Sequence, residues 1–326
     1  MYKTISIIIP YFKESPGVLF PLLSSINNQV GIDWEKVECI MVNDGADNSL
    51  PDDFYGLFTN LDIKIIMCKI NGGPGVARQV GIDEAHGEYV MFCDADDVIH
   101  NVAVLGVFFD EFTRQKPDVI MTPWVEELIE NGKYIYITHS DEATWMHGKI
   151  FRRQYLIDNN IRFQDELRVH EDSYFLALAF AFTDKIVKIP ITSYIWKYHT
   201  NSITRINNAE YTFKSMPEYI KAIETSYVEI ERRAPMLMEY KIIQFITYVY
   251  FVTQKPEWQA SENQTYLNIL EIAFRKMIYR FTHYFREALQ EKINEIYSQE
   301  RIRLFNGCME TELFKDWVAR MLGVAE

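Results

Sequence analysis

The chain of 326 residues is long enough for one large domain and a smaller second one, and its composition, 48% hydrophobic and 24% charged, excludes a disordered protein. The formal net charge of −13 argues against a protein that follows a nucleic-acid backbone through its overall field. The acidity lies in residues 1–210, which hold 18 Lys and Arg against 30 Asp and Glu, whereas residues 211–326 hold 15 against 16.

Cysteine usage and hydropathy indicate a soluble, cytoplasmic protein. Cys39, Cys68, Cys93 and Cys308 lack the spacing of a metal site, and the first three lie in apolar runs, which predicts reduced thiols. The longest apolar stretch, 174–182, is too short to span a bilayer. We therefore expect no transmembrane segment and no signal peptide.

Four apolar runs rich in Ile and Val predict buried strands. They are residues 4–9, 37–42, 63–68 and 88–93. Such nearly continuous apolar strands are typical of a sheet that is covered on both faces. Ser15 and Pro16 predict a helix start after the first strand, and residues 75–87 have helical spacing that ends in a glycine. This alternation predicts an α/β sandwich with a mostly parallel sheet, whose ligands bind beyond the carboxyl ends of the strands.

The fourth strand is followed at once by Asp94, Asp96 and Asp97. Like charges this close repel one another unless a cation lies between them. Carboxylate oxygens suit Mg²⁺ or Mn²⁺, which often bind substrate phosphates as well. An Asp-rich turn that caps the following helix is the structural alternative.

The loops after the second and third strands are also candidates for ligand binding. Asp44 could accept a hydrogen bond from a uracil base, or it could form an Asx turn. The third loop carries Gly72, Gly73 and Gly75. A helix start near Pro74, with Arg78 on the first turn, would favour an anion there, although a simple glycine turn explains the loop equally well.

Glu171 and Asp172 begin a strongly apolar helix. First-turn carboxylates stabilise a helix through its dipole, and a general base at the mouth of a site is the functional alternative. After about residue 210 the pattern becomes helical and aromatic, which predicts a helical lid or an interface between copies of the chain. Four basic residues there leave an anionic polymer open as a partner, although a solvated helix face is favoured: Arg275, Lys276, Arg280 and Arg286.

The order of these motifs resembles family 2 glycosyltransferases, which have the nucleotide-diphosphosugar (GT-A) fold. The matching segments are "ISIIIPYF", "VNDGAD", "NGGPGVARQ", "DADD", "WMHGKIFR" and "HEDSYF", in residues 4–205. The resemblance implies an α/β fold with a mixed, mostly parallel sheet sandwiched by helices. It implies a catalytic domain over residues 1–209, and the helical C-terminal domain would then cover residues 210–326.

The resemblance also implies site residues. Those that would bind the nucleotide-sugar are Pro10, Tyr11, Glu14, Asp44, Asn71, Gly73, Arg78, Asp94, Ala95 and Lys149. Asp94, Asp96 and His199 would hold a divalent cation, Mn²⁺ or Mg²⁺; for His199, contact with a phosphate or solvent is the alternative. Asp172 would be the catalytic base with Glu171 beside it, and Trp145 and His170 would face the acceptor.

Three residues depart from the family pattern, since Asn43, Ala46 and Gln79 stand where Asp, Ser and Asn are usual. A UDP-sugar donor is favoured, and purine or thymidine nucleotides stay open. The implied activity is metal-dependent inverting transfer of a hexosyl or N-acetylhexosaminyl group to an acceptor hydroxyl of a glycan, polymer, protein or modified nucleobase in DNA. The alternatives are a catalytically silent sugar-nucleotide-binding scaffold and a nucleotidyltransferase, which ordinarily has a glycine-rich loop after its first strand.

Overall fold

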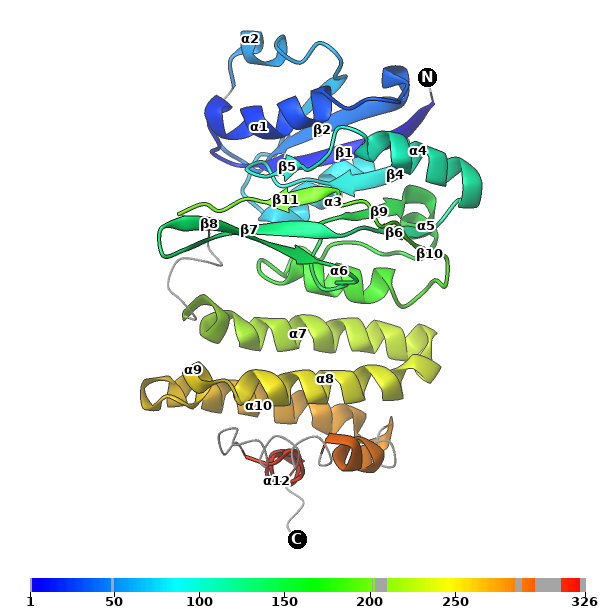
Figure 1. Cartoon of the computed structure of the whole chain (residues 1–326). Helices are drawn as coiled ribbons and strands as arrows, with labels where there is room; N and C mark the ends of the chain where they lie inside the picture. The colour runs from blue at the N-terminus through cyan, green and yellow to red at the C-terminus, as the bar shows by residue number, and fades with distance from the viewer. Residues whose placement is uncertain are drawn as a thin grey trace. The chain divides into compact units, whose positions relative to one another are not determined.

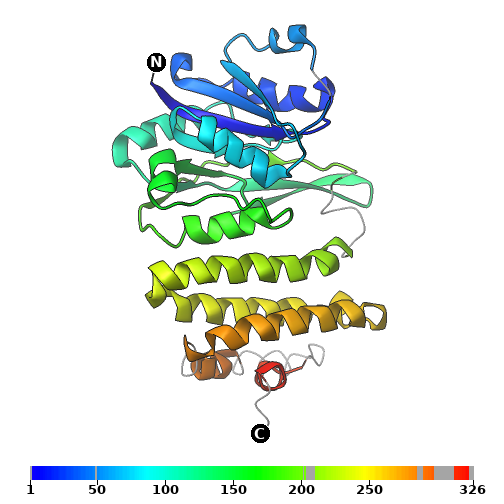
Figure 2. The same ribbon diagram turned by 180° about the vertical axis from the view of Figure 1, so that it is seen from behind.

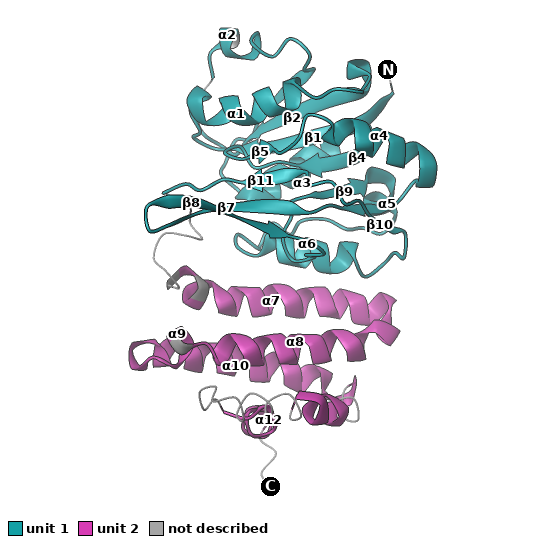
Figure 3. Cartoon of the chain, in the orientation of Figure 1, with its two compact units in different colours: residues 1–200 teal, residues 201–326 magenta. Residues whose placement is uncertain are grey.

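The computed structural model describes residues 2–47, 50–200, 202, 210–284, 289–296 and 312–322. The chain divides into two compact units, residues 1–200 and residues 201–326 (Figure 3). Cys308 and Arg286, on which the sequence made predictions, lie outside the described residues.

The first unit is built on a seven-stranded sheet in the order β10-β6-β9-β4-β1-β2-β3 (Figure 1). Its strands are β1 (Lys3–Tyr11), β2 (Val37–Asn43), β3 (Ile63–Met67), β4 (Gly87–Phe92), β6 (Val119–Met121), β9 (Lys149–Arg152) and β10 (Ile186–Lys188). Strands β1 to β4 pair in parallel, as do β6 and β10, whereas β9 runs antiparallel to both of its neighbours. The prediction of a mixed, mostly parallel sheet is confirmed.

A second sheet of four strands, which the sequence reading did not predict, has the order β5-β11-β7-β8. Its strands are β5 (Val98–Ile99), β7 (Trp124–Glu130), β8 (Lys133–His139) and β11 (Tyr194–Trp196). Strand β5 directly follows the acidic loop, and β11 pairs with both β5 and β7. This sheet therefore brings residues near 124 and 194 to the acidic loop.

Helices cover both faces of the large sheet, because consecutive residues of its central strands point to opposite sides and are apolar on both. The helices of this unit are α1 (Pro16–Asn27), α2 (Asp52–Tyr55), α3 (Pro74–Glu84), α4 (Val104–Gln115), α5 (Arg153–Asp158) and α6 (Glu171–Ala179), with a 3₁₀ turn at Trp34–Lys36. Figure 1 shows α1 and α4 on one face, and Figure 2 shows α3, α5 and α6 on the other. Helix α3 lies very close to β1, since a Cβ on Gly81 would come within 2.3 Å of Ile8 Cγ2.

The second unit is helical, as the periodicity predicted. Its helices are α7 (Glu210–Arg233), α8 (Met238–Thr253), α9 (Pro256–Gln259), α10 (Gln264–Phe281) and α12 (Phe314–Leu322), with 3₁₀ turns at Pro235–Leu237, Ser261–Asn263 and Thr282–Tyr284. Leu270, Phe274 and Phe281 of α10 are fully buried and form part of its core. Within the described part of the chain, every helix is too short or too polar to cross a membrane.

Candidate active site

The carboxyl ends of β1 to β4 and the segments that follow them hold most of the predicted site residues. Pro10 and Tyr11 are the last residues of β1, and both are buried. Glu14 folds back over the same loop, where its carboxylate accepts hydrogen bonds from the main-chain N–H groups of Phe12, at 2.6 Å, and Lys13, at 3.1 Å. This carboxylate therefore stabilises the turn that leads from β1 to α1.

Asp44 holds the glycine-rich loop in place. Its two carboxylate oxygens accept hydrogen bonds from the main-chain N–H groups of Gly72 and Gly73, each at 2.8 Å. Gly73 has φ of +93°, a conformation that L-residues rarely adopt. Asn71, which directly precedes Gly72 and Gly73, is half-buried. Asp44 is only 5% exposed. A base that bound to its carboxylate would therefore have to share it with, or displace, these two N–H groups.

The acidic loop after β4 contains carboxylates with different partners. Asp94 and Asp96 are half-buried, and Ala95 between them is buried. Asp97 is fully buried: it accepts hydrogen bonds from the Tyr194 hydroxyl at 2.7 Å and from the Lys197 main-chain N–H at 2.8 Å. Asp97 therefore anchors β11 to the loop. This structural role accounts for the presence of one of the three clustered acids, so a ligand is not needed to explain it.

Burial and mutual repulsion raise the pKa of two of these acids. Asp97 has a pKa well above its usual value because it is buried and lies beside Asp94 and Asp96. The pKa of Asp96 is raised by burial and then by the charge of Asp94. Burial alone would raise the pKa of Asp94 too, but the charges of Arg78 and His147 and the hydrogen bond from Arg78 together lower that pKa.

Arg78 is the cation at the centre of the site. Its Nη2 donates to Asp94 at 2.7 Å and its Nη1 to Glu171 at 2.8 Å, and the side chain is 7% exposed. Burial opposes its charge, but Asp94 and Glu171 together raise its pKa. Arg78 and Glu171 are 93 positions apart, so this one guanidinium joins the loop after β4 to the start of α6.

Helix α6 begins with the predicted pair of acids. Gly75 leaves room for Glu171, since a Cβ at position 75 would lie 2.7 Å from Glu171 Cγ. Burial and the neighbouring Asp172 raise the pKa of Glu171 to about 7, although Arg78 opposes this. The described hydrogen bonds to the Asp172 carboxylate come from Ser173 and end on Oδ1. Oδ2 can therefore accept a hydrogen bond from a substrate hydroxyl. His170, just before the helix, has φ of +59°.

His199 and the acidic loop could together hold a divalent cation. The Nε2 of His199 donates to the main-chain oxygen of Asp96 at 2.8 Å and lies 3.6 Å from its carboxylate. Ligand atoms of Asp96, Asp97 and His199 lie within 4.8 Å of one another, and so do those of Asp94, Asp97 and His147. Oxygen-rich sets with one imidazole suit Mg²⁺ or Mn²⁺. Binding through Nε2 would require His199 to release its bond to Asp96.

Lys149 is less accessible than the resemblance implied. Its side chain is 1% exposed, and its ammonium group donates to the carbonyls of Trp145 at 2.5 Å and His147 at 3.3 Å. Burial lowers its pKa to about 8. Lys149 thus supports the segment that carries Trp145. His147, Tyr194 and Asp97 were missing from the expected site residues, because their role depends on the second sheet.

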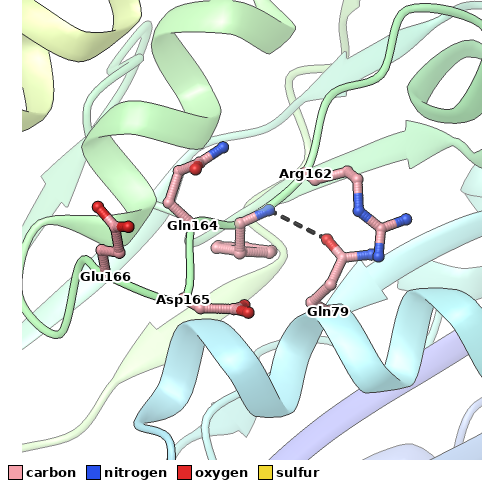
Figure 4. A pocket seen from close by; sticks show the side chains of 6 residues that line it. Gln79, Arg162, Gln164, Asp165 and Glu166 are labelled. Atoms are coloured by element: carbon pink, nitrogen blue, oxygen red, sulfur yellow. Dashed lines mark hydrogen bonds between the residues drawn. The ribbon is translucent and has the colours of Figure 1, made fainter.

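A pocket of about 290 Å³ lies against the middle of α3, beside the predicted site (Figure 4). Its lining residues are Gln79, Arg162, Phe163, Gln164, Asp165 and Glu166. The side-chain oxygen of Gln79 accepts the main-chain N–H of Phe163 at 3.0 Å. Gln79, one of the departures from the family pattern, therefore fixes the loop that leads to α6.

Comparison with known proteins agrees with this architecture. The family model described as Glycosyl transferase family 2 matches residues 6–166. The uncharacterized glycosyltransferase EpsJ of Bacillus subtilis is 25% identical over 232 residues, which cover 63% of this chain and 64% of that protein. The poly(ribitol-phosphate) beta-N-acetylglucosaminyltransferase TarS of Staphylococcus aureus is 27% identical over 210 residues, which cover 59% of this chain and 35% of that protein. The chain thus spans less than two thirds of the length of these two relatives.

Solved structures of S. aureus TarS have the same fold. The structure of its residues 1–349 in complex with UDP-GlcNAc matches 84% of this chain and 80% of that one, with a TM-score of 0.66 and 19% identity. The fold and the acidic strand-end loops define an α/β protein of the GT-A class. Residues 6–166 of the chain match glycosyl transferase family 2, as the motifs predicted.

Proposed function

We propose that the chain is an inverting glycosyltransferase that moves a hexosyl or N-acetylhexosaminyl group from a UDP-sugar to an acceptor hydroxyl. The observation that carries the proposal is the Arg78 bridge, which holds Asp94 of the acidic loop and Glu171 of the α6 start on one side chain. Donor-binding and proton-accepting groups are thereby fixed next to each other. The family match and the UDP and UDP-GlcNAc complexes of TarS support a uridine-nucleotide donor.

The residues of this chain fit the divalent cation that such a donor needs. Asp96 and His199, whose ligand atoms lie within 4.8 Å of one another, would hold it together with the neighbouring Asp94, and once bound it would neutralise charge on the departing diphosphate. The repulsion that raises the pKa of Asp96 and Asp97 is what a bound cation would relieve.

Asp172 would act as the general base. As the acceptor oxygen bonds to the anomeric carbon, its proton would pass to Asp172 Oδ2, and the bond from the anomeric carbon to the phosphate oxygen would break with its electron pair on UDP. One such displacement inverts the anomeric centre. Arg78 and Glu171 would position the base by fixing the first turn of α6 against α3.

The experiment replaces the base and leaves the donor site intact. Asp172→Asn should lower transfer from UDP-GlcNAc or UDP-glucose by about 10²- to 10⁴-fold, the usual contribution of a general base, while UDP still stabilises the protein against heat. The exposed Asp165, on the loop before α6, gives a matched control as Asp165→Asn. Full activity of Asp172→Asn would remove this residue from the role, and turnover in excess EDTA would contradict the cation.

A further inference from the structure

Five aromatic rings form a stacked group next to the acidic loop, here called the aromatic wall. They are Trp124, Trp145, His147, Tyr194 and Trp196. His147 lies at the centre: its ring stacks on Tyr194 at 4.9 Å with 15° between planes, and on Trp196 at 5.5 Å with 28°. Trp145 is nearly parallel to His147, at 6.0 Å and 9°.

The wall has a buried layer and a partly exposed layer. Trp124 and Tyr194 are 1% exposed and His147 is 6% exposed, whereas Trp145 and Trp196 are only partly buried, with ring centres 5.1 Å apart. Three buried rings thus hold two indoles that solvent can reach. The two indoles need little further ordering when they bind a ligand, which lowers the entropic cost of binding.

Hydrogen bonds connect the wall to the acidic loop, and a charge interaction relates it to the proposed base. The Tyr194 hydroxyl donates to Asp97 and accepts from the Asp94 main-chain N–H at 2.9 Å. On the other side, the buried Lys149 donates to the Trp145 carbonyl, and the charge of Asp172 acts on the Lys149 ammonium group. The wall therefore lies close to both the acidic loop and the proposed base.

Sheet order places the wall on the acceptor side. The loops proposed for the nucleotide follow β1, β2 and β3, which lie on one side of β4. Trp145 lies just before β9, which is on the opposite side of β4, and Trp124 and Trp196 belong to the second sheet. A ligand that extends from the nucleotide loops across the acidic loop would reach the wall last, where the acceptor must lie.

We infer that the aromatic wall binds a pyranose ring of the acceptor, so that the acceptor is a glycan; this inference rests on the proposed function. One face of a pyranose carries C–H groups, which pack on an indole, while the ring hydroxyls remain hydrated. Two lysines in the described part of the chain adjoin the wall, and both have partners: Lys149 donates to two carbonyls, and the Lys197 ammonium group lies 3.9 Å from the Glu127 carboxylate. A polyol-phosphate acceptor would require cations available to its phosphates, and it offers no ring to stack.

The inference can be tested by saturation-transfer NMR on the full chain with UDP and the diamagnetic Mg²⁺, using methyl β-D-glucopyranoside, a β-linked gluco-oligosaccharide and ribitol 5-phosphate as probes. We expect saturation of the C–H protons on one face of the pyranosides. Trp196→Ala and Trp145→Ala should weaken pyranoside binding about fivefold, the effect of one lost aromatic contact. Trp34→Phe, in the 3₁₀ turn before β2, is the matched control.

The outcomes separate the two proposals. If UDP fails to bind the unaltered chain, the proposed function fails. If UDP binds but the pyranosides do not, or bind both variants as well as the unaltered chain, only the inference is overturned. The inference is also overturned if ribitol 5-phosphate is the probe that binds, or if the variants raise the KM of the donor and not that of the acceptor. UDP binding by each variant verifies that it is folded.

Discussion

Two carboxylates at the same sheet edge are held in opposite ways. Asp44, after β2, is held by the main-chain N–H groups of Gly72 and Gly73, which lie 28 and 29 residues further along the chain. Asp94, after β4, is held by the buried guanidinium of Arg78, which it shares with Glu171. The first arrangement depends on backbone shape, whereas the second depends on a balance of charges between distant segments.

The difference explains why we propose the acidic side as the place where a cation binds. Several carboxylates meet there around one arginine, and burial raises the pKa of Asp96, Asp97 and Glu171. That region gains most from an added cation, because the acids repel one another without it. The Asp44 region gains little from a cation, since peptide dipoles already surround its carboxylate.

Removing Arg78 is the most severe way to break this comparison. Arg78→Met keeps much of the side-chain volume but leaves the buried Glu171 and the half-buried Asp94 without their cation, so the free energy of unfolding should fall by about 3–5 kcal/mol. Urea denaturation measures it. Arg162→Met removes a guanidinium that pairs with Asp83 at the surface, where both side chains are about half exposed, and should change stability by about 1 kcal/mol or less. Equal losses in the two variants would contradict the central role of Arg78.

Asp44→Asn should have a smaller effect. Asn has one carboxamide oxygen where Asp44 has two carboxylate oxygens, and its NH₂ group cannot accept. One of the N–H groups of Gly72 and Gly73 would therefore lose its partner, which costs about 1–3 kcal/mol. The matched control is Asp47→Asn on the exposed part of the same loop. Hydrogen exchange of the Gly72 and Gly73 amides gives a local readout, and unchanged protection would show that Asp44 does not hold the loop.

The pH dependence of stability should show the smallest effect. Glu171 has a pKa raised from 4.5 to about 7 by burial and by Asp172, so the native state binds more protons than the unfolded chain in that interval. In the metal-free protein, the contribution of Glu171 to the free energy of unfolding should therefore be greatest below about pH 4.5. It should fall by about 1–3 kcal/mol as the pH rises through 7.

Glu171→Gln tests that slope, because the amide cannot ionise. Asp96 and Asp97 have raised pKa values and add slope of the same sign, so the variant should reduce the fall in stability between pH 5 and 7.5 without removing it. The exposed Glu166 provides the control variant, Glu166→Gln, with the slope preserved. A slope that is the same in Glu171→Gln as in the unaltered chain would assign the dependence to the acidic loop alone.

Much of the fold could be read from the sequence. The strands predicted at 4–9, 37–42, 63–68 and 88–93 are β1 to β4, with ends shifted by one or two residues. Helices α1 and α3 begin at the prolines that predicted them, although the Ser15 side chain makes no capping hydrogen bond. Short β5 and β11 were missed, since strands of two or three residues carry almost no periodic signal.

The sequence by itself determined which polar residues meet at one edge of the sheet. Each nearly continuous apolar run fixes where a strand ends and which polar loop follows it. Only the tertiary structure decided how those residues divide their work: Asp97 is turned inward onto Tyr194, Lys149 is buried under Trp145, and Arg78 is shared between Asp94 and Glu171. The physical reason is that these contacts join side chains far apart in the chain. Their existence depends on how α3, α6 and the second sheet pack, for which no local pattern codes.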